Sequence, residues 1–324
     1  MKNRLCVAHE ITQAIAAGQP IVALESALVT HGFAPPANLE IAQRMEEAVR
    51  EAGALPATIA VLSGKPRVGL SGDELARLAS DRTAHKVSLR DLPLVLAQGA
   101  NVAQGANVAQ GANVAQGANG GTTVAATMHL AHRAGIRVFA TGGIGGVHRG
   151  HPEDVSADLP ALGSIPIITV CAGAKAILDL PRTLEYLETH GVTVIGYRTD
   201  EFPAFYSRNS GLGVDARVEA PEEVARVAQA RTELGLLSAL LICVPVPADD
   251  ELPTGEAEAA IGRAVEEAEA AGVSGKALTP FLLGRMVELT GGLARRANES
   301  LLLNNARVAA RIARALYPAS NLST

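Results

Sequence analysis

A lysine behind a buried strand is the residue of this chain best placed for covalent chemistry. Residues 165–171 are almost wholly apolar and rich in β-branched side chains, which predicts a buried parallel strand. Lys175 follows at the carboxyl edge of that strand, where open α/β sheets bind ligands. Partial burial there favours the neutral amine, which is a nucleophile. The simpler alternative is a lysine whose side chain reaches from the strand end into water.

Three carboxylates stand where they could serve acid–base chemistry or bind a cation. Glu25 directly follows a predicted strand over residues 21–24, and burial would let it act as a general acid. Asp154 and Asp158 are four residues apart, with the hydroxyl of Ser156 between them. Such a cluster can bind a hard divalent cation through oxygen, or it can cap the segment that follows. The spacing alone favours the cap.

Two glycine-rich stretches predict backbone that approaches a ligand closely. Gly120-Gly-Thr-Thr-Val124 opens a predicted helix, where Thr122 or Thr123 can cap and free N–H groups favour an anion. An ordinary capped helix is the alternative. Residues 142–146 hold four glycines just before His148 and Arg149, which predicts a loop around a polar ligand. Neither stretch fits the dinucleotide fingerprint or the Walker motif.

Two further polar residues have both a functional and a structural interpretation, and for Asn298 the structural one is stronger from the sequence alone. Lys86 lies in a short stretch that would bring cations to the anion site, or that forms a solvated loop. Asn298, on the predicted last helix, could bind a planar amide, or it is an amide on the helix surface.

Alternating strand and helix signals predict the scaffold that positions these residues. Strands are expected near residues 21–24, 136–140, 165–171, 192–195 and 239–244, and helices over 37–51, 123–133, 221–234, 256–271 and about 295–316. Residues 58–62 and 67–70 flank a Ser-Gly-Lys-Pro turn and predict an antiparallel hairpin. The pattern indicates α/β class, with one three-layer α/β/α domain over residues 1–324 around a mixed, mostly parallel central sheet.

A hexapeptide repeat interrupts this pattern. The hexad Ala-Gln-Gly-Ala-Asn-Val occupies residues 97–102 and recurs at 103–108 and 109–114, and a partial fourth copy ends at Asn119. A glycine at every sixth residue opposes a stable helix, and three hexads are few for a stacked solenoid. The repeat predicts an extruded, mobile insertion loop at about 97–119.

Composition excludes several classes of protein. Apolar residues make up 48% of the 324 residues and aromatic residues 3%, and the net charge of −5 offers no basic stripe for nucleic acid. Three widely separated cysteines form no disulfide framework or metal motif. The longest apolar run, 236–246, is too short to span a bilayer, and the first residues lack a signal-peptide core. We expect a soluble cytoplasmic protein with no nucleic-acid or membrane partner.

Together these stretches resemble the pseudouridine-5′-phosphate glycosidases, which are related to the indigoidine synthase A-like proteins. The matching segments run through nearly the whole chain in family order, at residues 23–26, 31–32, 86–93, 121–128, 139–150, 154–158, 170–175, 202–208, 279–283 and 304–307. The departure from the family pattern is the triple hexad, which looks like three extra copies inserted before the Gly-Thr-Thr turn.

The resemblance implies a homotrimeric, manganese-dependent enzyme of pseudouridine catabolism, with one Mn²⁺ per subunit. Such an enzyme splits pseudouridine 5′-phosphate reversibly into uracil and ribose 5-phosphate. By this match Lys175 is the nucleophile that forms a Schiff base, Glu25 is the proton donor, and Asp154 holds the metal. The match also implies a set of substrate-binding residues: Lys86, Val124, His148, Ser156, Ala157, Asp158 and Asn298.

The implied chemistry suits the residues present. The leaving atom of a C-glycoside is carbon, so the paired-carboxylate route of ordinary glycosidases is not available. Capture of C1′ as a lysine imine supplies the electron sink that lets the carbon–carbon bond break. Two alternatives stay open: a Schiff-base lyase acting on another sugar phosphate, and a non-catalytic sugar-phosphate-binding protein.

Overall fold

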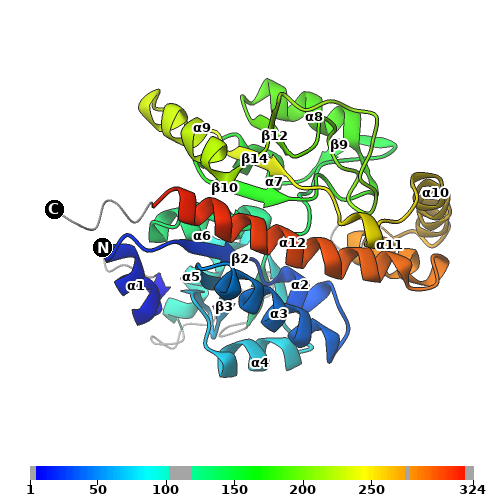
Figure 1. Cartoon of the computed structure of the whole chain (residues 1–324). Coiled ribbons are helices and arrows are strands. Elements are labelled where there is room, and N and C mark those ends of the chain that lie inside the picture. Colours follow the sequence, from blue (N-terminus) through cyan, green and yellow to red (C-terminus); the bar gives the residue numbers. More distant parts are fainter. Residues whose placement is uncertain (1–4, 102–118, 274–277, 318–324) are drawn as a thin grey trace. The chain divides into compact units, whose positions relative to one another are not determined.

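The computed structural model describes residues 5–101, 119–273 and 278–317 (Figure 1). The chain forms two compact units, Met1–Phe139 with Ala309–Thr324, and Ala140–Val308. The interpretation of residues 1–324 as one domain stays a prediction.

The first unit is built on a mixed sheet with the strand order β1-β4-β3-β2-β7, to which β6 and β5 are added through β3. Pairs β1–β4, β2–β3 and β5–β6 are parallel, whereas β3 runs antiparallel to β4 and β6. The strand bounds are β1 Cys6–Val7, β2 Ile21–Leu24, β3 Leu55–Leu62, β4 Lys65–Val68, β5 His85–Val87, β6 Gly120–Thr122 and β7 Val138–Ala140.

The hairpin between β3 and β4 follows from its turn residues. Ser63 and Gly64 both have positive φ angles, 50° and 72°, and such a two-residue turn matches the twist of the flanking strands. Every residue of β3 except Leu55 is buried. The predicted antiparallel hairpin is therefore confirmed, although its second strand covers residues 65–68 rather than 67–70.

Helices cover the sheet of the first unit. Local signals set their ends: Ser71 and Glu74 form a capping box at the start of α4, and Gly135 ends α6 with φ of 91°. Figure 1 shows α3 beside α4. The helix bounds are α1 His9–Ala16, α2 Ala27–His31, α3 Ala37–Glu51, α4 Gly72–Ser80, η1 Leu89–Asp91, α5 Leu92–Asn101 and α6 Val124–Ala134.

The second unit contains a parallel sheet with the order β10-β14-β12-β13 and an antiparallel sheet with the order β11-β8-β9. Every residue of β10 and β14 is buried, as expected for strands covered on both faces. The strand bounds are β8 Val147–His148, β9 His151–Val155, β10 Ile168–Cys171, β11 Leu178–Asp179, β12 Thr193–Tyr197, β13 Ala216–Val218 and β14 Leu240–Cys243.

The helices of the second unit begin at clear sequence signals. Asp179 accepts a hydrogen bond from Arg182 N at the start of α8, and Pro221 opens α9. Figure 1 shows α10 and α11 side by side. The bounds are α7 Asp158–Leu162, α8 Leu180–Thr189, α9 Pro221–Glu233, η2 Ala248–Asp250, α10 Thr254–Ala270, α11 Leu278–Leu289 and α12 Leu293–Ala315, whose last turns belong to the first unit.

The predicted α/β class, with a mixed, mostly parallel sheet and helices on both sides, is confirmed. The repeat differs in part from its prediction, because α5 extends to Asn101 and the first hexad therefore begins in a helix. Residues 102–118, the remainder of the predicted loop, lie outside the described residues.

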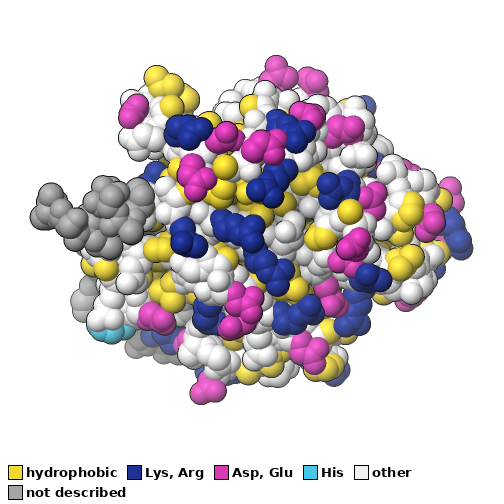
Figure 2. Space-filling model, in the orientation of Figure 1, with side chains coloured by type: hydrophobic (Ala, Val, Ile, Leu, Met, Phe, Trp, Pro, Cys, Tyr) yellow, Lys and Arg dark blue, Asp and Glu magenta, His cyan; other side chains and the backbone are white. Residues whose placement is uncertain are grey.

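Surface charge and helix composition are the features that bear on nucleic-acid and membrane partners. Acidic and basic side chains are interspersed over the face shown in Figure 2. Within the described part of the chain, every helix is too short or too polar to cross a bilayer.

Candidate active site

The residues singled out from the sequence fall into two groups, one in each unit. Glu25, Lys86 and Val124 belong to the first unit. The second unit holds the larger group, which comprises His148, Asp154, Ser156, Ala157, Asp158, Lys175 and Asn298.

In the first unit, Glu25 is half-buried and lies between β2 and α2. The next residue, Ser26, is buried and firmly fixed. Its Oγ donates a hydrogen bond to Ile59 O at 2.6 Å and accepts one from Thr122 N at 3.0 Å. Thr122 Oγ1 donates to the same Ile59 carbonyl at 2.6 Å. These bonds tie the turn that carries Glu25 to β3 and to the glycine-rich β6.

Lys86 and Val124 are connected to this turn through strand β6, which pairs with both β3 and β5. Lys86 is paired with Gly121 in the β5–β6 ladder, and Val124 is the first residue of α6. A Cβ atom on Gly121 would lie 2.5 Å from Ser26 O, so only glycine allows this close approach. The structure thus brings Glu25, Lys86 and Val124 to neighbouring strand ends of one unit.

The predicted side-chain cap of α6 is wrong. Thr123 occupies the cap position, but its Oγ1 is buried without a hydrogen-bond partner among the described residues. The Thr122 hydroxyl donates to Ile59 O and accepts from Thr127 Oγ1. The Thr123 side chain therefore makes no cap bond at the start of α6.

In the second unit, two glycine-rich loops are joined by backbone hydrogen bonds beyond the end of β10. Ala172 N donates to Gly142 O at 2.8 Å, Ile144 N to Gly173 O at 3.0 Å, and Lys175 N to Ile144 O at 3.0 Å. Lys175 is half-buried, and its own carbonyl accepts from Leu178 N at 3.0 Å. Its backbone is thus held on both sides, as a nucleophile at a strand end requires.

Gly173 is the tightest point of these paired loops. Its φ angle is +81°, and a Cβ atom there would overlap Pro203 O. We expect Gly173→Ala to destabilise the protein by about 2–4 kcal/mol, the combined cost of an unfavourable φ and of overpacking. The control is Gly211→Ala, because Gly211 has a φ of +76° but no atom within 4 Å of an added Cβ. Denaturant unfolding checks this, and an equal loss in both variants would contradict the packing argument.

Asp154 and Asp158 do not form one cation-binding group. Asp158 is buried, and its Oδ2 accepts from Gly145 N at 2.8 Å, so it fixes the first glycine loop. Ser156 Oγ accepts from Asp158 N at 3.2 Å, and Ala157 is exposed just before α7. The predicted cap is also wrong for Asp154, because that residue lies on β9 and α7 has no side-chain cap.

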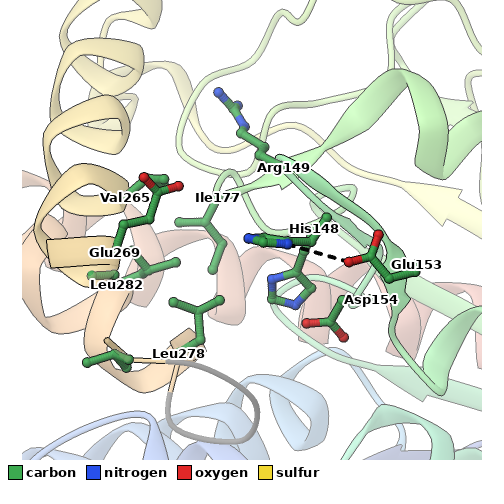
Figure 3. A pocket seen from close by; sticks show the side chains of 12 residues that line it. His148, Arg149, Glu153, Asp154, Ile177, Val265, Glu269, Leu278 and Leu282 are labelled. Atoms are coloured by element: carbon green, nitrogen blue, oxygen red, sulfur yellow. Dashed lines mark ion pairs between the residues drawn. The ribbon is translucent and has the colours of Figure 1, made fainter. Parts of the chain in front are cut away.

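Asp154 and His148 line the same pocket, which has a volume of about 210 Å³. In Figure 3 the side chains of Glu153 and Asp154 lie on one side of the pocket, opposite Val265 and Leu282. The opposite wall, from α10 and α11, is largely apolar. The lining residues on the sheet side are His148, Arg149, His151, Glu153, Asp154 and Ile177.

The donors around Asp154 limit the kind of metal site that can form. In the described ranges, no group of three or more His, Cys, Asp or Glu side chains is arranged to hold an ion. Asp154 is an exposed carboxylate, and its hard oxygen atoms fit Mn²⁺ with water or substrate oxygen as the other ligands. A single protein ligand of this kind predicts weak, exchangeable binding.

Asn298 is half-buried on α12 and is not among the residues that line the pocket. The segment around it is fixed to η2, because Asp250 accepts hydrogen bonds from Ser300 Oγ and Arg296 Nε, both at 2.6 Å. The Ser300 bond, followed by the Arg296 bond, holds the pKa of Asp250 below its usual value.

Sequence reasoning missed one residue that shapes the site, Asn305. It is fully buried on α12, and its Nδ2 donates to Thr141 O at 2.9 Å and to Gly142 O at 3.3 Å. It therefore fixes the start of the first glycine loop. The signal was the pair of asparagines at 304–305 within an otherwise apolar stretch of helix.

Comparisons with known proteins show the family to which this chain belongs. The family model described as indigoidine synthase A like protein matches residues 10–315. The pseudouridine-5′-phosphate glycosidase of Methylobacterium nodulans is 51% identical over 311 residues, covering 95% of this chain and 87% of the relative. The enzyme of that name from Caldanaerobacter subterraneus is 50% identical over 315 residues, covering 97% of each chain.

Two solved structures are similar over almost the whole chain. The prealnumycin C-glycosynthase in complex with ribulose 5-phosphate is 39% identical, with a TM-score of 0.84 and 97% of each chain covered. An indigoidine synthase A-like protein from Thermotoga maritima is 36% identical, with a TM-score of 0.85, and the match covers 98% of this chain and 99% of that one.

Proposed function

The chain belongs to the family of indigoidine synthase A-like proteins, and we propose that it acts as a pseudouridine-5′-phosphate glycosidase through an imine on Lys175. It is an enzyme of pseudouridine catabolism that cleaves, reversibly, the C-glycosidic bond of pseudouridine 5′-phosphate to give uracil and ribose 5-phosphate. The observation that carries the catalytic proposal is the position of Lys175, whose backbone is held between two paired glycine loops at a strand end.

The covalent route follows from the chemistry of a C-glycoside. Lys175 Nζ attacks C1′ as the C1′–O4′ bond opens, and O4′ takes up a proton. The nitrogen lone pair then forms the C=N bond while the C1′–C5 electrons pass to uracil C5, which is protonated by Glu25. Water hydrolyses the imine, which releases ribose 5-phosphate and restores the amine.

Three features support a sugar phosphate as the substrate. The positive end of the α6 helix dipole, at Val124, favours a phosphate, and Lys86 on β5 supplies positive charge nearby. The similar C-glycosynthase binds ribulose 5-phosphate. We assign the remaining substrate contacts to His148, Ser156, Ala157, Asp158 and Asn298.

The metal, the assembly and the location belong to the same proposal. We infer one Mn²⁺ per subunit, held by Asp154 together with water, in a cytoplasmic homotrimer. When bound, the ion supplies positive charge that offsets the negative charge of substrate oxygens. Asp154 is suited to this because it is exposed on β9 and lines the pocket that His148 shares.

The test is release of uracil from pseudouridine 5′-phosphate by the purified protein in the presence of Mn²⁺. We expect excess EDTA to stop the reaction and added Mn²⁺ to restore it. Asp154→Ala should raise the Mn²⁺ concentration for half-maximal activity by at least about 10-fold, since even indirect metal contacts have effects of that size.

The matched control is Glu153→Ala, which removes the neighbouring exposed carboxylate of the same pocket. Its Mn²⁺ requirement should stay within about 2-fold of the wild type, the range expected of a surface carboxylate that binds no metal. Full activity in EDTA, with no metal found by elemental analysis, would exclude the metal. Absence of uracil under all conditions would favour a lyase acting on another sugar phosphate or a non-catalytic binding protein.

A further inference from the structure

Arg149 connects the turn that follows Lys175 to helix α10. Its Nε donates to Leu178 O at 3.0 Å and its Nη2 to Ala176 O at 3.0 Å. On its other edge, Nη1 and Nη2 donate to the two carboxylate oxygens of Glu258 at 2.9 and 3.1 Å. All three guanidinium nitrogens are therefore engaged by acceptors of the protein itself.

The carbonyls that Arg149 binds belong to the same short turn as Lys175. Leu178 N donates to Lys175 O at 3.0 Å and closes the turn from inside, while Arg149 holds two of its carbonyls from outside. Ala176 and Leu178 are both buried. The Arg149 guanidinium is thus one of the groups that hold this turn, beside the Leu178 N–Lys175 O bond and the pairing of Leu178 with His148.

Glu258 sets that orientation. A carboxylate bound by both ends of a guanidinium fixes the plane of the group, which a lysine ammonium cannot reproduce. The Arg149 hydrogen bond also keeps the pKa of the Glu258 carboxyl below its usual value, so Glu258 is charged at neutral pH. In Figure 3 the Arg149 side chain extends away from Glu153 and Asp154, the carboxylate side of the pocket.

Global stability does not explain the arrangement. The Arg149 side chain is 33% exposed and that of Glu258 50% exposed, and ion pairs this exposed contribute little to unfolding free energy. The bonds from Arg149 lie instead at the 175–178 turn, next to the nucleophile. A displacement of about 1 Å in a reacting group can cost roughly 100-fold in rate.

We propose that Arg149, oriented by Glu258, is a positioning residue that holds the 175–178 turn so that the Lys175 amine meets the sugar carbon. This inference rests on the proposed role of Lys175 as the nucleophile. Its role here is to hold the turn, since four of its five N–H groups are bound by Leu178, Ala176 and Glu258.

The experiment compares Arg149→Lys, Glu258→Gln and a control, Arg285→Lys, in the full-length enzyme. Arg285 also forms a two-pronged ion pair with a glutamate of α10, Glu267, but it holds α11 rather than the turn. The readouts are kcat, KM, and the single-turnover rate at which borohydride-trapped adduct accumulates on Lys175.

We expect Arg149→Lys to lower kcat and the adduct rate together by about 10–100-fold, with KM changed less than about 3-fold. Glu258→Gln should lower both rates less, because its amide oxygen still accepts one bond. The double variant should be little worse than Arg149→Lys alone, since both act through one contact. Arg285→Lys should keep the wild-type rates.

Two results would overturn the proposal. A raised KM with unchanged kcat in Arg149→Lys would make Arg149 a substrate-binding residue instead. Unchanged adduct rates in Arg149→Lys and Glu258→Gln would show that the turn holds itself. Failure of the underlying catalytic proposal is distinct, because the wild-type enzyme would then release uracil without any adduct on Lys175. If Arg149→Lys unfolds, the milder Glu258→Gln variant, which keeps the guanidinium, carries the test.

Discussion

Lys175→Ala is expected to lose nearly all uracil release, a fall of at least about 10⁴-fold, as for loss of the nucleophile in covalent enzymes. The reason is that no other group can take over the electron sink once the C1′–N bond cannot form. Lys175→Arg should be equally inactive, because a guanidinium stays protonated and cannot attack carbon. Steady-state uracil release measures both variants.

The matched control is Lys65→Ala, which removes an exposed lysine of β4 and should leave turnover unchanged. Lys175→Ala should still fold and bind substrate, because Lys175 makes its fixed contacts through backbone atoms. Thermal unfolding with and without pseudouridine 5′-phosphate tests this. Substantial turnover by a folded Lys175→Ala variant would remove the imine from the mechanism.

Glu25→Gln is expected to lower uracil release by about 10²–10⁴-fold, the range for loss of a general acid. Glutamine keeps the size of the side chain but has no proton of suitable acidity to give to uracil C5. The turn itself should stay intact, since Ser26, not Glu25, makes the buried bonds to Ile59 and Thr122.

A second readout separates this role from substrate binding. Imine formation from free ribose 5-phosphate involves no uracil, so borohydride should still trap that sugar on Lys175 in Glu25→Gln at close to the wild-type rate. If trapping is lost together with uracil release, Glu25 acts earlier, in binding or in imine formation. Wild-type turnover would show that another group donates the proton.

Short-range patterns were enough to predict the scaffold. Buried parallel strands such as β10 and β14 are apolar throughout, and turn chemistry at Ser63 and Gly64 specified the hairpin. The position of Lys175, just after the carboxyl end of β10, could be predicted in the same way. In the sequence, the end of a buried strand is the point where an apolar run stops. Its chemical role was implied by the resemblance to the family.

Long-range contacts explain what local patterns did not predict. The spacing of Asp154 and Asp158 favoured a helix cap, yet Asp158 turns inward to Gly145 and Asp154 faces the pocket. Thr123 stands at the cap position without making the cap bond. Asn305 reaches the first glycine loop from a helix more than 160 residues away in sequence. No periodicity encodes pairings at such separations.

The most direct test of the catalytic account is borohydride reduction of the wild-type enzyme during turnover, followed by peptide mass mapping. The sequence makes the assignment clear, because only Lys2, Lys65, Lys86 and Lys276 compete with Lys175. The account predicts that the Lys175 peptide gains the mass of reduced, dehydrated ribose 5-phosphate, and that no other peptide does. An enzyme that releases uracil while Lys175 stays unmodified would contradict it.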